Sequence, residues 1–207
     1  IRSKKIRGYF ETILDKAKRA DAYVIAIQEG DHLIFDLLSE MCKEEGAFIE
    51  LNDEYWKQHY IIYKNINKKM YMELNRREQF NLFSYGAYTI AATNVHFFRY
   101  DEVHDLNNKL KSSRRADINI YMGDFNAYFS DFEKKVNNTG YNFTGYTDAR
   151  GYNQYNYQNI DYIFTTHDKY TQIRSVEDKV NMKKDSEGNS KTAASDHPAI
   201  FLVIDYP

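Results

Sequence analysis

The 207-residue sequence contains one cysteine, two prolines and no long apolar run. The single Cys42 cannot form an intrachain disulfide, which excludes a secreted fold stapled by disulfides, and we expect it to be a small buried hydrophobic residue. No apolar stretch approaches the roughly 20 residues that a bilayer span requires, and no signal peptide is visible. These absences favour an intracellular protein with no membrane span, and we expect it to be a monomer.

Charge of one sign is also lacking. Lysine and arginine number 28 and aspartate and glutamate 30, which gives a formal net charge of −2. A global basic field, typical of many nucleic-acid binders, is therefore absent, so contact with phosphate must be local or supplied by metal ions. The length suffices for one domain with a hydrophobic core.

Hydrophobic periodicity predicts two amphipathic helices around a buried strand near the N-terminus. Residues 4–20 repeat apolar side chains at helical spacing, and residues 22–30 form an apolar run that favours a buried strand. Residues 31–46 predict the second helix, with Asp31 as its N-cap and Gly46 as its C-terminal stop.

The rest of the chain is rich in strand patterns. The expected strands are 46–51, 59–64, 69–74, 78–83, 87–95, 117–122, 159–166 and 198–205, with a hairpin turn at 84–87. We expect helices at 101–116 and 130–138, and polar surface loops at 141–159 and 180–196. No repeat or linker divides the chain. This order predicts a single α/β domain, residues 1–207, with two packed sheets and helices outside.

Several polar residues stand where an apolar strand meets a loop, and the rim of a sheet is where such folds build ligand sites. They are Glu29, His96, Asp124, Asn126, Asp161, Asp196 and His197. Each taken alone has an ordinary interpretation as a surface acid, a turn former or a core histidine. Together, the carboxylates would repel one another without a cation. Hard oxygen ligands without Cys/His spacing indicate Mg²⁺ or Mn²⁺ rather than Zn²⁺.

The motifs that carry these residues occur in a familiar order. They are "AIQEG", "NVHFF", "YMGDFNAY", "NIDYIF" and "ASDHPAI". In this order they resemble the endonuclease/exonuclease/phosphatase superfamily, which has the deoxyribonuclease I-like fold. The resemblance implies a four-layered α/β sandwich, with two mixed β-sheets face to face and helices outside. It also implies metal-dependent cleavage of phosphate esters at the sheet rim.

The resemblance further implies a role for each motif residue. Glu29 and Asp196 match metal ligands, and Asp124 matches the aspartate that activates the attacking water or helps to hold the metal. Asn126 matches the amide that hydrogen-bonds the phosphate. The last part of the constellation consists of two histidines and an aspartate. His197 matches the histidine that contacts the scissile phosphate, Asp161 the carboxylate paired with it, and His96 the other active-site histidine.

The N-terminal strand that carries a metal-site Asn in this superfamily has no counterpart here. We expect that strand to be missing from this chain, because a sheet without its first strand exposes a long edge.

The substrate is predicted less directly. Arg76 and Arg77 follow an expected strand and are candidates for contact with backbone phosphates. Four other histidines match no motif and are interpreted as surface or structural: His32, His59, His104 and His167. The predicted function is a Mg²⁺-dependent phosphodiesterase, a nuclease acting on DNA or RNA. The alternatives are a sphingomyelinase-like or inositol-phosphate phosphoesterase, and a catalytically inactive binding scaffold.

Overall fold

The computed structural model contains two helices and eleven strands in the part of the chain that it describes. The described residues are 2–52, 58–75, 78–96, 116–126, 145–152, 157–165, 170–176 and 199–204. The helices are α1 (Arg2–Ala17) and α2 (His32–Glu45). The strands are β1 (Tyr23–Gly30), β2 (Phe48–Asn52), β3 (Gln58–Lys64), β4 (Asn67–Asn75), β5 (Glu78–Tyr85), β6 (Tyr88–His96), β7 (Ile118–Asp124), β8 (Gly145–Tyr152), β9 (Tyr157–Thr165), β10 (Tyr170–Val176) and β11 (Ala199–Ile204).

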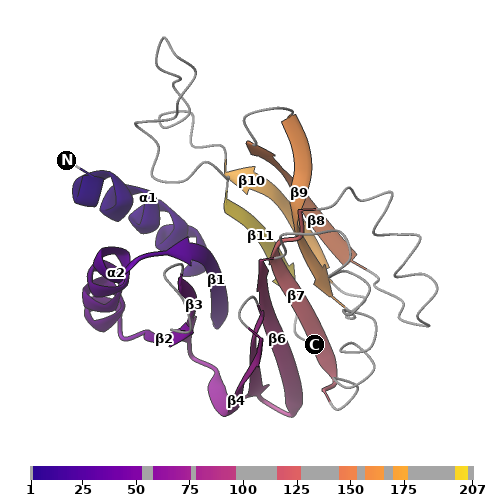
Figure 1. Cartoon of the computed structure of the whole chain (residues 1–207). Helices are drawn as coiled ribbons and strands as arrows, with labels where there is room; N and C mark the ends of the chain where they lie inside the picture. The colour runs from indigo at the N-terminus through magenta and orange to yellow at the C-terminus, as the bar shows by residue number, and fades with distance from the viewer. Residues whose placement is uncertain are drawn as a thin grey trace.

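The strands form two larger sheets and one pair. The first sheet has the order β1-β3-β2 and is antiparallel. The second has the order β4-β5-β6-β7-β9-β8 and is mixed, because β6 and β7 run parallel. The third is the pair β10-β11, which lies beside β8 and β9 (Figure 1). The first two sheets face each other, with α1 and α2 on the outer side of the first (Figure 1). The predicted α/β fold with two packed sheets is confirmed.

The two helices pack on the outer face of the first sheet through an apolar cluster that includes Phe10, Leu14, Leu38, Met41 and Tyr60. Fully burying one such large apolar side chain contributes about 1.5–3 kcal/mol, so this cluster stabilises the helices more than their propensity does. The predicted ends of the second helix are also confirmed.

The caps of α2 have the geometry that their residue types favour. Asp31 accepts a hydrogen bond from the backbone N–H of Ile34 at 2.9 Å, which satisfies one of the donors left open at a helix start. Gly46 ends the helix in the left-handed conformation, with φ of 66°, a position where glycine has no Cβ to clash.

Cys42 lies in this helical layer with 1% of its surface exposed, as the sequence predicts. Burial raises the pKa of its thiol from 9.0 to about 11. At pH 8 we expect native protein to react with a disulfide reagent at least roughly 10²-fold more slowly than protein unfolded in guanidinium, because the thiolate is the reactive form. Since the folded pKa is raised, the free energy of unfolding should fall as the pH rises above 9. Fast labelling of the native protein would contradict this burial.

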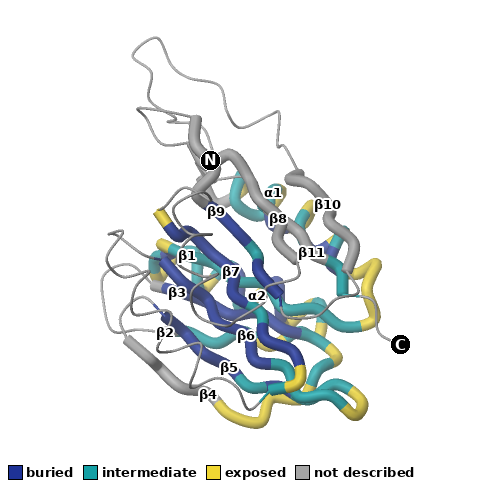
Figure 2. Tube along the Cα trace, turned by 90° about the vertical axis from the view of Figure 1, so that its right-hand side faces the viewer, coloured by how far each residue is buried: buried dark blue, intermediate teal, exposed yellow. Residues whose placement is uncertain are grey.

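A second apolar cluster fills the space between the two sheets. Its buried members are Ile61 and Tyr63 of β3, Phe83 of β5, Ala92 of β6 and Met122 of β7. Figure 2 shows these strands, together with β9, as largely buried (dark blue). Because side chains alternate across a strand, the residues two positions further along the same strands also point between the sheets.

The structure corrects the sequence-based expectation for residues 141–159. The loop prediction is wrong at 145–152, which form β8, and at 157–159, which begin β9. The polar sequence of β8 gives no apolar alternation from which a strand could be predicted. The segment is a strand because it pairs antiparallel with β9, from Gly145 opposite Thr165 to Tyr152 opposite Tyr157. The strand β10 was not predicted. The expected helices 101–116 and 130–138 and the loop 180–196 lie outside the described residues, apart from residue 116.

No helix within the described ranges combines the length and the apolar character needed to cross a bilayer.

Candidate active site at the rim of the two sheets

Three of the predicted site residues meet in register at one end of the six-stranded sheet. His96 of β6 pairs with Asp124 of β7, and Asp124 pairs with Asp161 of β9. Paired residues share a face, and this face is the one that carries Ala92 and Met122 into the core between the sheets. The three residues are buried, at 4%, 8% and 6% exposure, and they lie at the rim of that core.

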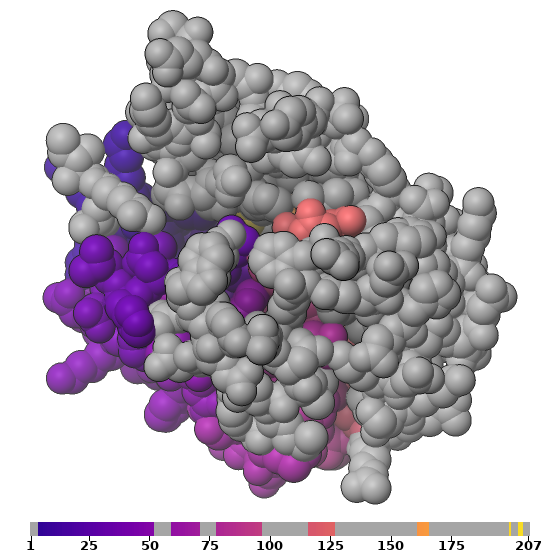
Figure 3. Space-filling model, viewed as in Figure 1, coloured from indigo at the N-terminus to yellow at the C-terminus, as the bar shows by residue number. Residues whose placement is uncertain are grey.

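The turn of residues 123–126, with the sequence GDFN, places the carboxylate of Asp124 and the amide of Asn126 in different surroundings. Phe125 is fully buried, and its ring packs edge-on against Phe164, with centroids 5.3 Å apart, on the sheet face opposite Asp161. This anchor lets Asp124 point into the rim while Asn126 is exposed, with φ of 46°. The backbone N–H of Asn126 donates to Asp124 Oδ1 at 2.8 Å. The turn therefore holds one carboxylate oxygen and leaves the other directed at the site. Part of the 116–126 segment reaches the molecular surface (salmon in Figure 3).

Glu29 comes from the other sheet, at a bulge that ends β1. The pairing with β3 shifts register between Ile27 and Gly30, and Glu29 has φ of 56°. Gly30 lies flat against the Tyr60 ring, since a Cβ there would come within 2.2 Å of that ring. The Tyr60 hydroxyl also donates to the backbone carbonyl of Asp31 at 2.7 Å. The bulge is thus held on both sides and turns Glu29 toward the second sheet.

The imidazole of His96 is where the two sheets meet. Its Nε2 lies 3.3 Å from Glu29 Oε1 and 3.9 Å from Asp124 Oδ2. The His96 side chain is 5% exposed and that of Glu29 is 40% exposed, so the histidine is the buried part of the site and the glutamate its solvent-facing part. Two carboxylates from different sheets therefore converge on one nitrogen.

Convergent carboxylates fit a hard divalent cation, because Mg²⁺ and Mn²⁺ prefer oxygen ligands. In the described ranges no group of three or more His, Cys, Asp or Glu side chains has the arrangement of a metal site. The third predicted ligand, Asp196, lies outside those ranges, as do the predicted His197, Arg76 and Arg77.

His59 is the residue near this site that sequence reasoning missed. It is 3% exposed, and its ring centroid lies 5.7 Å from that of His96, so of the two interpretations, surface or structural, burial agrees with the structural one. His59 alternates with Ile61 and Tyr63 on the face of β3 that points between the sheets. A polar residue at the end of the apolar run "HYIIYK" was the available signal. His32 is exposed, as expected.

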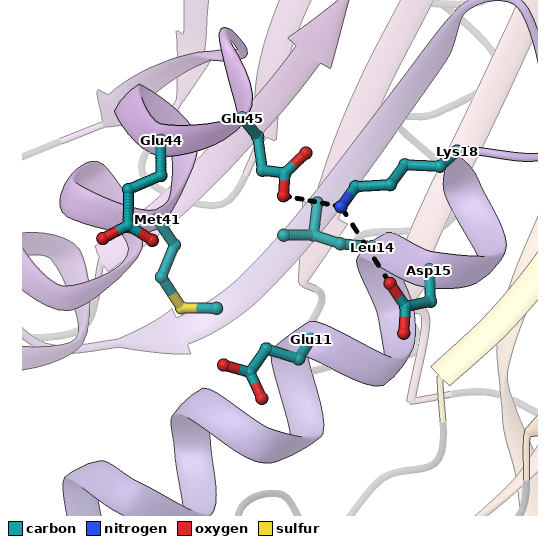
Figure 4. Close-up of a pocket in the computed structure, with 7 residues that line it drawn as sticks. All are labelled: Glu11, Leu14, Asp15, Lys18, Met41, Glu44 and Glu45. Carbon is teal, nitrogen blue, oxygen red and sulfur yellow. Dashed lines mark hydrogen bonds and ion pairs between the residues drawn. The ribbon is translucent and has the colours of Figure 1, made fainter.

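A hollow elsewhere on the surface has no part in this site. It lies between α1 and α2 and is lined mainly by acidic side chains over Leu14 and Met41 (Figure 4). Lys18 bridges it, with its Nζ 2.5 Å from Glu45 Oε1 and 4.0 Å from Asp15 Oδ1. These contacts indicate a solvated ion-pair surface rather than a ligand site.

The chain shares its fold with solved structures of endonuclease/exonuclease/phosphatase family proteins. Solved structures that share it include D. rerio TDP2 complexed with a single-strand DNA product, with a TM-score of 0.62 and 14% identity over 96% of this chain and 90% of that one. Another is the 3′ phosphatase NExo from Neisseria bound to a product DNA hairpin, with a TM-score of 0.60 and 12% identity over 98% of this chain and 96% of that one. An endonuclease/exonuclease/phosphatase from Bacteroides vulgatus has a TM-score of 0.59 at 14% identity, over 95% and 90% of the two chains. No family profile and no curated protein matches the sequence.

Proposed function

We propose that this protein is a divalent-metal-dependent phosphodiesterase, a nuclease that hydrolyses DNA or RNA. The observation that carries the proposal is the convergence of Glu29 and Asp124, from two different sheets, on Nε2 of His96 at 3.3 and 3.9 Å. An ordinary surface acid or turn-forming aspartate is not expected to lie this close to a buried imidazole. The convergence also disfavours an inactive scaffold, because a buried carboxylate and a buried imidazole beside a second carboxylate cost stability, and such clusters are typical of functional sites.

The metal-binding part of the proposal assigns Glu29 as a ligand of Mg²⁺ or Mn²⁺ and Asp196 as a further ligand, with Asp124 as either a ligand or the base that activates the attacking water. A divalent cation supplies neutralisation of the charge that builds on the phosphoryl oxygens during attack. The protein residues do the rest of the work by placing groups around the phosphate.

The remaining roles follow from where the side chains lie. Asp124 keeps one oxygen on the Asn126 backbone and turns the other to the site, where it can orient the attacking water as a general base. The exposed Asn126 amide and the His96 imidazole donate hydrogen bonds to non-bridging oxygens as charge develops there. His197, which the resemblance pairs with Asp161, is proposed to donate in the same way.

Two of the similar structures contain DNA, and this supports a nucleic-acid substrate for the present chain. The net charge of −2 means that phosphate contacts must be local. We propose that Arg76 and Arg77 provide them along the backbone of the bound strand.

The proposal is tested with the full-length protein on plasmid DNA, single-stranded RNA and bis-nitrophenyl phosphate, with Mg²⁺ and then with EDTA. We expect cleavage that chelation abolishes. Glu29→Gln should need at least about 10-fold more Mg²⁺ for half-maximal activity, because it replaces an anionic ligand by a neutral one. The matched control is Glu40→Gln on the surface of α2, where Glu40 Oε1 lies 3.7 Å from Arg7; its metal dependence should be that of the wild type.

Three results would contradict the proposal in different ways. Cleavage that survives chelation would remove the metal. Turnover of sphingomyelin or inositol phosphates, but not of nucleic acid, would favour the lipid or inositol alternative. Absence of turnover of every substrate would favour the binding scaffold.

A further inference from the structure

A buried amide joins the two sheets directly beneath the candidate site. Asn94 of β6 is completely buried and points between the sheets, like His96 two residues further along. Its Nδ2 donates to the carbonyl of Ile27 at 3.0 Å and to that of Tyr60 at 3.1 Å. Its Oδ1 accepts a hydrogen bond from Gln28 Nε2 at 2.6 Å. Both donors and the acceptor of this side chain are therefore used.

The positions that Asn94 holds are those next to the site. Ile27 stands two residues before Glu29 on β1, and Tyr60 follows His59 on β3. A single side chain thus connects the backbone of both strands of the first sheet that reach the site with the strand of the second sheet that carries His96.

We propose that Asn94 is a positioning residue, which sets Glu29 and His59 of the first sheet against His96 of the second. This inference deepens the proposed function and rests on it for its catalytic consequence. The apolar contacts between the sheets are non-directional and would tolerate small sliding movements. Directed hydrogen bonds in a buried, fully satisfied group select one alignment. Glu29 needs this support, because it lies beyond a register shift and is no longer aligned by regular strand pairing.

Asn81 of β5 provides a matched comparison. It is also completely buried, and it pairs with Ala92, so it points between the same sheets. Neither side-chain polar atom of Asn81 has a hydrogen-bond partner within the part of the chain that the structure describes. The two asparagines therefore share type, burial and sheet face, and differ in whether they are tied to the strands of the site.

The first test compares Asn94→Leu with Asn81→Leu, since leucine keeps the branched shape of asparagine and removes its hydrogen bonds. In protein with ¹⁵N-labelled histidine, Asn94→Leu should shift the imidazole resonances of His96 and His59, and Asn81→Leu should leave both in place. This measurement requires no activity. Unchanged His96 and His59 resonances in folded Asn94→Leu would overturn the positioning role.

The second test is kinetic. Asn94→Leu should lower kcat by about 10²-fold with little change in KM, because misplacement of reacting groups by about 1 Å has effects of this size. Asn81→Leu should retain the wild-type kcat. A wild-type kcat in Asn94→Leu would overturn the inference even if its resonances moved. If the wild type hydrolyses no phosphodiester but the resonances shift as expected, the proposed function fails and the positioning of the site stands.

A milder variant covers the case in which Asn94→Leu does not fold. Gln28→Leu removes one hydrogen bond of Asn94 from a half-buried side chain and leaves its two donors in place. We expect a smaller shift of the His96 resonances and a smaller loss of kcat than full release would cause. A Gln28→Leu protein identical to the wild type in both measurements would then overturn the inference.

Discussion

Replacement of Asp124 by asparagine should lower kcat by about 10²–10⁴-fold while the protein stays folded, since this is the range that a positioned base contributes. Asparagine keeps an oxygen able to accept the 2.8 Å hydrogen bond from the N–H of Asn126, so the GDFN turn can persist. The lost feature is the negative charge beside His96. Single-turnover rates on a nucleic-acid substrate at saturating Mg²⁺ measure the effect without a contribution from product release.

Asp117→Asn is the matched control, because it makes the same chemical change immediately before the opposite end of β7. Asp117 accepts hydrogen bonds from the backbone N–H and the hydroxyl of Thr89, both at 2.8 Å, and these bonds lower the pKa of its carboxyl. It is exposed and lies at the end of β7 opposite the rim, so its replacement should leave kcat unchanged. Equal activity losses in the two variants, or full activity in Asp124→Asn, would show that Asp124 has no special role.

Replacement of Gly123 by alanine should have the largest effect on stability. Gly123 has φ of 142°, and a Cβ there would lie 1.9 Å from the backbone carbonyl oxygen of Val95 on the paired strand β6. Relief of that overlap requires β6 and β7 to separate beside His96 and Asp124. We expect a loss of about 3 kcal/mol in the free energy of unfolding, which corresponds to a fall in Tm of about 6–12 °C for a domain of this size.

Gly8→Ala separates this steric effect from the general effect of replacing glycine. Gly8 lies inside α1, and nothing lies within 4 Å of the position of its Cβ. Alanine there should be neutral or stabilising, by up to about 1 kcal/mol, because it favours the helix. Thermal unfolding followed by circular dichroism compares the two variants. A Tm for Gly123→Ala equal to that of the wild type would mean that the strand pair accommodates a side chain.

Local patterns predicted the parts of this fold that depend on local physics. Asp31 and Gly46 mark the ends of α2 because side-chain capping and the left-handed conformation act within one turn of the chain. The position of two candidate site residues at the sheet rim was predictable for a related reason. An apolar strand that ends in a polar group places that group at the rim of a sheet, as with His96 and Asp124.

The parts that could not be predicted depend on contacts between distant segments. The strand β8 reads as a polar loop, and it is a strand because β9 pairs with it. His59 has no motif around it, and only the packing of β3 against β6 brings it to His96. Asn94 looks like an ordinary strand residue until the carbonyls of Ile27 and Tyr60 are placed beside it.

The division of the candidate site between two sheets has a consequence for how the proposed activity would be lost. Glu29 and His59 belong to one sheet, and His96, Asp124 and Asp161 to the other. Each sheet could retain its own hydrogen-bonded strands while the two drift apart in mild denaturant. Phosphodiester hydrolysis would then be lost at lower urea concentrations than the far-ultraviolet circular dichroism signal. Hydrolysis would therefore report whether the two sheets stay docked, and not whether the strands within each sheet stay paired.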